Sequence, residues 1–237
     1  MTLKNLTFIE HLEEFRLAVI KSVIFVIVSS VFVYTFTDKI FSQLVMPLGG
    51  TLVFIAPQEA FIANIKLAIF GGLYFSSPFV LYQVWDFISA GLQKRERARA
   101  AAYVFLSFIF FIIGSYFGYF FIAPIGIKFL LGFGTAQVIP MISVEKYVSF
   151  VCVLTLVFGL MFQLPLLILL LSKLGIVSPV MLARNRKYAI LMIFIISAIL
   201  TPPDVITQCI MAFPLIALYE LSIFLTRITT SERESKR

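Results

Sequence analysis

The chain has 237 residues, of which 61% are hydrophobic and only 13% are charged. Because soluble domains carry about 25% charged residues, this composition excludes an ordinary soluble protein and indicates one compact helical domain in a membrane. The net charge of +7 would suggest nucleic-acid binding if the chain were soluble. In a membrane protein it is explained by basic cytoplasmic loops and anionic headgroups, so we expect membrane lipids and no nucleic acid as partners.

Fifteen of the 19 lysine and arginine residues lie in four clusters, and long apolar runs separate them: residues 4–21, 94–99, 173–187 and 227–237. Positive charge is retained on the cytoplasmic side when a membrane protein inserts. The clusters therefore place both termini and two loops in the cytoplasm.

Six apolar segments are predicted to cross the membrane, since a spanning helix needs about 20 apolar residues: residues 17–36, 65–88, 100–122, 147–171, 188–200 and 205–224. The fifth has about 13 residues, and its length of ~20 Å is well short of a ~30 Å hydrocarbon core. We expect an all-α integral membrane protein whose last two spans are short. One membrane domain is predicted over residues 1–229, with a disordered cytoplasmic tail over residues 230–237.

An amphipathic helix is predicted ahead of the first span. Thr7 and Glu10 fit a helix capping box, and Phe8, Leu12 and Phe15 fall on one helical face. We expect this helix to lie at the cytoplasmic interface of the membrane.

The outer connections, residues 37–64 and 123–146, are long and contain several prolines and glycines. They are predicted to be structured caps with short helical pieces. Gly114 and Gly118 favour close packing within the fold, and Asp204 is expected to cap the last helix.

Aromatic residues suited to a belt at the membrane surface are Tyr82, Trp85, Tyr188 and Tyr219. Glu220, near the cytoplasmic end of the last span, is expected to pair either with a basic residue such as Arg227 or with another helix.

Catalytic chemistry has little support in this sequence. No nucleotide-binding loop, metal cluster or nucleophile–base pair is recognisable, and His11 is the only histidine. Cys152 and Cys209 lie inside apolar runs, where packing is the better interpretation than a disulfide. We therefore expect a protein that is not an enzyme and needs no cofactor.

Two acids stand in basic surroundings. Glu14 precedes Arg16, and Glu96 lies within the basic stretch 94–97. One interpretation is local charge balance by neighbouring ion pairs. The other is that two carboxylates on one cytoplasmic face each accept a guanidinium group in a two-point hydrogen bond, which a lysine cannot reproduce.

Several stretches resemble one family, in order and over nearly the whole chain: FIEHLEEFR at 8–16, SPFVLYQVW at 77–85, Glu96-Arg97, Gly114 to Pro124, FGLMFQLP at 158–165, RKY at 186–188 and LTPPD at 200–204. Together they resemble TatC, the multi-spanning subunit of the twin-arginine protein translocase.

The resemblance implies six transmembrane helices in a concave, glove-like bundle in the cell inner (plasma) membrane. It implies a receptor and core scaffold that binds the twin-arginine signal peptides of folded cargo proteins for export driven by the proton-motive force. The implied partners are single-span TatA and TatB type subunits and other copies of the chain itself.

The resemblance also implies site residues. Glu14 and Glu96 match the family's signal-peptide-binding acids, and the flanking positions are Phe15, Arg16, Phe87 and Arg97. Gln163 and Pro47 match positions that contact a partner helix, although an interhelical hydrogen bond remains an alternative for Gln163. The family often has proline where this chain has Ala90, and many members have glutamate at position 163. Because an amide cannot titrate, a proton relay through Gln163 is not expected.

Two other classes of function make demands that this sequence does not meet. A small-molecule transporter is expected to place ionisable residues near mid-membrane, where this chain offers only the amide of Gln163. An intramembrane enzyme needs a nucleophile–base pair or a metal set, and the sequence shows neither.

Overall fold

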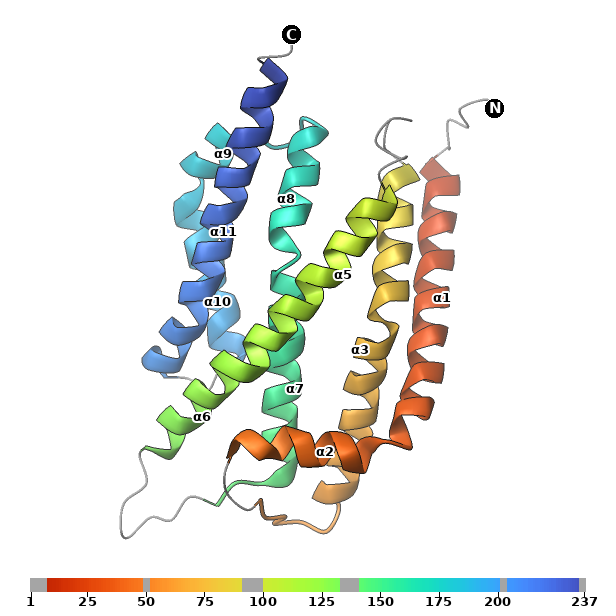
Figure 1. Ribbon diagram of the computed structural model, residues 1–237, viewed down its shortest axis with the longest axis vertical. Coiled ribbons are helices and arrows are strands. Elements are labelled where there is room, and N and C mark those ends of the chain that lie inside the picture. Colours follow the sequence, from red (N-terminus) through yellow and green to blue (C-terminus); the bar gives the residue numbers. More distant parts are fainter. Residues whose placement is uncertain (1–7, 49–51, 91–99, 133–140, 201–203, 235–237) are drawn as a thin grey trace. The chain divides into compact units, whose positions relative to one another are not determined.

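A computed structural model describes residues 8–48, 52–90, 100–132, 141–200 and 204–234. Over these ranges the regular elements are helices, and Val53 and Ser143 form an isolated bridge. The predicted all-α class is therefore confirmed for the described residues (Figure 1). The chain divides into two compact units, one of Met1–Met46 and Phe54–Phe108, the other of Pro47–Val53 and Ile109–Arg237.

The first unit contains α1 (Phe8–Tyr34), α2 (Thr37–Val45), α3 (Glu59–Ala90) and the start of α5 (Ala100–Phe117). Figure 1 shows α1 and α3 side by side. The helix predicted ahead of the first span is present, but it continues into that span as part of α1 and is not a separate element. Its place at the membrane interface stays a prediction. No glycine or proline lies within α1 to end the helix between its amphipathic start and its apolar part.

Glycines allow α3 to approach α1 closely. A Cβ atom added at Gly72 would lie 2.6 Å from the Ser30 Cα atom, and one added at Gly71 would lie 2.7 Å from a methyl group of Val33. Small residues permit such close helix packing in membranes. The pairing of α1 with α3 therefore depends on the absence of side chains at these two positions.

Pro78 lies inside α3 without ending the helix. A proline cannot donate a hydrogen bond to the carbonyl group four residues earlier, which here belongs to Tyr74. Ser77 Oγ donates to that carbonyl oxygen over 2.7 Å. The acceptor freed by Pro78 is thus satisfied locally, and α3 continues to Ala90.

Trp85 links α3 to α5 within the first unit. Its ring stacks on Tyr103 with centroids 5.1 Å apart, and its Nε1 donates to Ser107 Oγ over 2.5 Å. Trp85 and Tyr219 are both buried, so their predicted place in an interfacial belt is wrong. The indole N–H and the tyrosine hydroxyl form hydrogen bonds with protein atoms, so neither group needs water or lipid headgroups as a partner.

The second unit contains most of η1 (Met46–Leu48), the end of α5 and seven complete helical elements among the described residues, which Figure 1 colours from green to blue. These seven are η2 (Gly118–Ile122), α6 (Ala123–Leu131), α7 (Val144–Met161), α8 (Leu164–Lys173), α9 (Pro179–Arg184), α10 (Arg186–Leu200) and α11 (Val205–Glu234).

Close packing at Gly114 and Gly118 is confirmed. A Cβ atom at Gly114 would lie 2.5 Å from the carbonyl oxygen of Phe158, and one at Gly118 would lie 3.0 Å from the Phe158 Cβ atom. Both glycines therefore face α7 inside the second unit, where they allow two helices to meet at main-chain distance.

The outer connections contain the predicted short helical pieces. The first holds α2 and η1 (Met46–Leu48), and the second holds α6. Within the second unit, Val53 N–H donates to the Ile142 carbonyl oxygen, and Val144 N–H donates to that of Val53, each over 3.0 Å. These two main-chain bonds tie the connections together just before α7.

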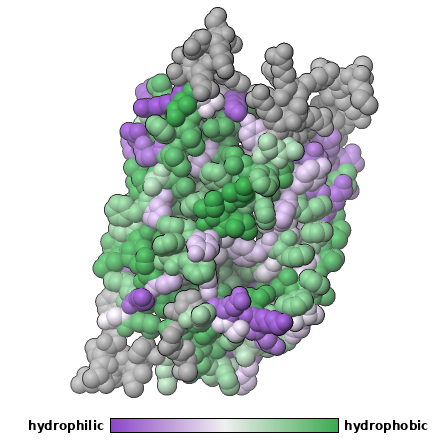
Figure 2. Space-filling model, viewed as in Figure 1, coloured by the Kyte–Doolittle hydropathy of each residue, from purple (hydrophilic) through white to green (hydrophobic). Residues whose placement is uncertain are grey.

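The described residues include five helical segments that are long and apolar enough to cross a membrane: Leu12–Tyr34, Glu59–Ile88, Ala101–Leu131, Val144–Lys173 and Val205–Thr229. Figure 2 shows hydrophobic residues over the sides of the helices and hydrophilic ones near their ends. On α1, Val28 and Val31 are 62% and 68% exposed, as a lipid-facing surface requires. The chain is a multi-pass membrane protein.

Of the last two helices, both predicted to be short, α10 is short and α11 is not. α10 has 15 residues, so its length of ~22 Å is short for a membrane span, and the total of six spans stays a prediction. α11 has 30 residues and is not short. The apolar pattern in the sequence indicates only the part of α11 that can contact lipid. The helix itself continues into polar residues, because main-chain hydrogen bonding does not depend on apolar side chains. The boundary between a membrane domain ending at residue 229 and a tail over residues 230–237 stays a prediction.

Asp204 caps α11, as the sequence analysis predicts. The main-chain N–H of Thr207 donates to Asp204 Oδ1 over 2.7 Å, and the Thr207 hydroxyl donates to Oδ2. Both bonds favour the ionised carboxylate, the hydroxyl bond most, and they lower the pKa of Asp204. The cap therefore stabilises the fold above the ordinary carboxyl pKa of about 4 and is lost as pH falls through the lowered value.

Replacing Asp204 by alanine is expected to lower the melting temperature of the detergent-solubilised chain at pH 7. Asp204→Asn should lower it less, because asparagine is also a good helix cap. The gap between wild type and Asp204→Ala should shrink below about pH 4 as the native carboxylate takes up its proton. Thermal melts of the three proteins at pH 7 and pH 3 check this. An equal gap at both pH values would contradict it.

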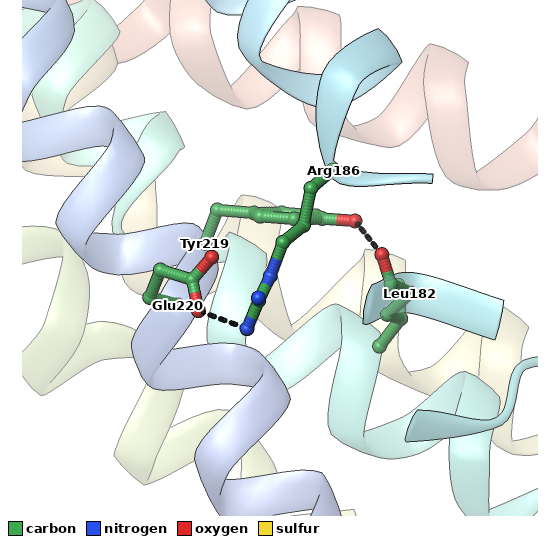
Figure 3. A network of polar contacts seen from close by, with 4 residues as sticks. All are labelled: Leu182, Arg186, Tyr219 and Glu220. Carbon is green, nitrogen blue, oxygen red and sulfur yellow. Dashed lines mark hydrogen bonds and ion pairs between the residues drawn. The ribbon is translucent and has the colours of Figure 1, made fainter. Parts of the chain in front are cut away.

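A polar network joins α9, α10 and α11 in the second unit (Figure 3). Arg186 Nη2 pairs with Glu220 Oε2 at 2.8 Å, and the Tyr219 hydroxyl donates to the Leu182 carbonyl oxygen over 3.0 Å. The partner of Glu220 is thus on another helix. Because both charged side chains are more than 40% exposed, their pairing contributes only about 0–1 kcal/mol. Its main effect is to position the start of α10 on α11.

Candidate functional site

A hollow of about 170 Å³ lies between α1 and α3 in the first unit. Its lining residues are Glu14, Leu17, Ala18 and Lys21 from α1, and Gln83, Asp86 and Phe87 from α3. On each helix these positions are spaced by three and four residues, which places them on one face. The hollow is therefore built by two helical faces turned toward each other.

An aromatic pair stands at this end of the two helices. The rings of Phe15 on α1 and Phe87 on α3 have centroids 5.2 Å apart and are tilted by 52°. Tilted pairs at this distance are favourable for aromatic quadrupoles. The contact fixes the first turns of α1 against the last turns of α3 and leaves Phe15 about half exposed.

The charges around the hollow are unequal. Glu14 and Asp86 contribute two carboxylates, Lys21 contributes one ammonium group, and Gln83 adds an amide. At neutral pH the hollow therefore carries a net charge of one negative unit. Leu17, Ala18 and Phe87 supply apolar surface, so the arrangement can take one cationic group on an aliphatic stem.

The structure brings some of the predicted site residues together. Glu14 and Phe87 line the hollow, and Phe15 contacts Phe87. Arg16 is exposed on α1 and does not line the hollow. Glu96 and Arg97 lie outside the described residues, so their predicted roles stay predictions.

Sequence reasoning missed Lys21, Gln83 and Asp86. A usable signal was present, because Lys21 follows Glu14 by two helical turns and Gln83 precedes Phe87 by one. Counting helical neighbours of the two predicted residues would have found both. Asp86 was overlooked because it directly follows Trp85, and this part of the sequence was interpreted as belonging to an aromatic belt at the membrane surface.

Gln163 and Pro47 belong to the second unit. Gln163 lies at the break between α7 and α8, where its N–H donates to the Leu160 carbonyl oxygen and its own carbonyl accepts from Leu167 N–H, both over 2.9 Å. Pro165 follows in the first turn of α8. A proline is tolerated there because the first turn of a helix leaves main-chain N–H groups without an internal partner. The partner contacts of Gln163 and Pro47 stay predictions.

Metal binding finds no support in the described part of the chain. No group of three or more His, Cys, Asp or Glu side chains there could hold a metal ion.

Comparison with known proteins identifies the family. The family model described as Sec-independent protein translocase protein (TatC) matches residues 10–214. The chain belongs to the TatC family. Its members are components of a protein translocase and not enzymes, and the resemblance found in the sequence motifs is confirmed.

Relatives and solved structures of the TatC family match this chain over most of its length. Sec-independent protein translocase protein TatC from Carboxydothermus hydrogenoformans is 41% identical, and the match covers 94% of both chains. The protein of the same name from Aquifex aeolicus is 37% identical over 95% of this chain and 96% of its own. A crystal structure described as the twin arginine translocase receptor TatC has a TM-score of 0.86 and 38% identity, covering 93% of this chain and all of that one.

Proposed function

We propose that this TatC-family chain is the receptor subunit that binds twin-arginine signal peptides and scaffolds the export of folded proteins. The observation that supports this most is the hollow between α1 and α3, which carries Glu14 beside an apolar surface. A cationic side chain with an aliphatic stem matches both properties. Arginine is the best match, because its planar guanidinium group donates two parallel hydrogen bonds to the two oxygen atoms of one carboxylate.

In this proposal each of two carboxylates binds one arginine of the signal peptide. Glu14 on α1 binds one arginine, and Glu96, which follows α3 in the sequence, binds the other. Phe15 and Phe87 contact the apolar part of the peptide. Arg16 and Arg97 partly neutralise the negative charge of Glu14 and Glu96 and orient their carboxylates.

The membrane arrangement in the proposal has six spans in a concave bundle, with α10 as a short fifth span. Both termini lie in the cytoplasm, and the membrane is the cell inner membrane. Single-span TatA and TatB type subunits and further copies of the chain assemble with it, with Gln163 and Pro47 contacting a partner helix. The proton-motive force drives transport, and no cofactor takes part.

Binding of a synthetic signal peptide to the detergent-purified chain tests the receptor function. We expect Glu14→Gln and Glu96→Gln each to weaken an Arg-Arg peptide about tenfold or more, which is about 1.4 kcal/mol. A Lys-Lys peptide should bind wild type as weakly. The matched control is Glu13→Gln, an exposed carboxylate one residue away on α1 that does not line the hollow. It should bind like wild type.

Equal binding by all these proteins and peptides would overturn the receptor proposal. Glu14 and Glu96 would then be interpreted as structural residues that balance neighbouring positive charges. Solute uptake by vesicles containing this chain alone would instead favour a small-molecule transporter.

A further inference from the structure

We propose that Asp86 is a second carboxylate for the arginine that Glu14 binds, so that the hollow is a pocket for a single guanidinium group. The inference rests on the proposed receptor function and deepens it. It assigns a specificity role to Asp86, and it assigns to Lys21 the role of limiting the pocket to one cation.

The positions of the two acids support a shared ligand. Glu14 belongs to the α1 face of the hollow and Asp86 to the α3 face, and both side chains are exposed to solvent. A group entering between the helices therefore meets a carboxylate from each side. The hollow of about 170 Å³ exceeds the ~30 Å³ share of one water molecule several times. It is large enough to take a side chain.

The donors of arginine suit this lining better than those of lysine. A guanidinium group carries five N–H donors in a fixed plane, whereas an ammonium group carries three on a point charge. Two carboxylates and the amide oxygen of Gln83 offer enough acceptors to engage several of the five. Phe87 and Leu17 supply the apolar surface that the methylene stem covers.

Charge balance limits the pocket to one cation. Glu14, Asp86 and Lys21 sum to one negative charge, which one arginine neutralises. Lys21 also repels any cation that enters, so it weakens binding while excluding a second basic residue. Opposite effects are therefore expected on removing the charge of Asp86 and that of Lys21.

The test uses the full chain in detergent and four labelled signal peptides, with Arg-Arg, Lys-Arg, Arg-Lys or Lys-Lys at the pair. Asp86→Asn is expected to weaken the Arg-Arg peptide about tenfold, and Asp86→Glu should retain most of the affinity. Lys21→Met should strengthen binding about threefold or more, because a repulsive charge is removed. Asp38→Asn, an exposed acid on α2 in the same unit, is the matched control.

The peptide series shows which arginine is affected. In Asp86→Asn, one of the two singly substituted peptides should bind as well as Arg-Arg, because the advantage of a guanidinium is lost at that position alone. The other singly substituted peptide should still bind more weakly than the Arg-Arg peptide. Emission from Trp85, the only tryptophan, checks that α3 stays folded in each variant.

Three results would overturn the inference. Asp86→Asn could behave like Asp38→Asn, it could weaken all four peptides equally, or Lys21→Met could weaken binding. If Glu14→Gln still abolishes Arg-Arg binding in the same experiment, only the role of Asp86 is wrong. If Glu14→Gln also has no effect, the proposed receptor function fails with it.

Discussion

Replacing Trp85 by alanine is expected to lower the free energy of unfolding of the first unit by about 3–5 kcal/mol. The indole is 5% exposed, stacks on Tyr103 and donates to Ser107 Oγ, so the change removes a large buried contact and a hydrogen bond together. Because Asp86 and Phe87 follow directly on α3, peptide binding should weaken as well. The measurement is the fraction of monodisperse protein after heating in detergent, followed by size-exclusion chromatography.

Trp85→Phe is the matched control for this prediction. It keeps an aromatic ring against Tyr103 and loses the hydrogen bond to Ser107, so we expect a loss of only about 1 kcal/mol. If Trp85→Ala were as stable as wild type, the side chain would not pack between α3 and α5, and the interfacial belt would be the better interpretation.

Replacing Gly72 by valine is expected to destabilise the pairing of α1 and α3 by about 3 kcal/mol or more. A Cβ atom there would lie 2.6 Å from both the Ser30 Cα and main-chain N atoms, and main-chain atoms cannot move aside as a flexible side chain can. The helices must separate, which also disrupts the hollow built on the same pair. Thermal unfolding followed by Trp85 fluorescence, together with peptide affinity, measures both effects.

Gly126→Val is the control for the steric argument. The nearest atom to a Cβ at Gly126 is Phe150 Cζ at 3.4 Å, which is ordinary van der Waals contact with the end of a side chain. This variant should therefore stay close to wild type in both measurements. Equal losses in the two variants would show that glycine itself, and not close packing at Gly72, determines the stability.

The local chemistry of single positions was predictable from the sequence. Asp204 as a helix cap and the glycine pair at Gly114 follow from rules that act within one or two turns. The continuity of α1 was missed because a change from amphipathic to apolar composition does not by itself end a helix. The burial of Trp85 was missed for a different reason: in a membrane chain, lipid-facing and protein-facing positions are both apolar.

The candidate site was predictable in part. Glu14 and Phe87 were identified through motifs, and the structure brings them to one hollow. Lys21 could have been found by counting helical neighbours of Glu14, but Asp86 could not, because its relevance depends on which faces of α1 and α3 meet. That choice is set by tertiary contacts such as Gly72 against Ser30, which leave no periodic signal in either helix.

Photo-crosslinking of a bound signal peptide tests the central claim most directly. The peptide carries a photoreactive residue next to its arginine pair, and the adducts on the full chain are mapped by mass spectrometry. The account predicts adducts within residues 12–21 and 83–87, which disappear when an unlabelled Arg-Arg peptide competes and persist with a Lys-Lys peptide. Adducts confined to α10 and α11, or competition by both peptides alike, would contradict it.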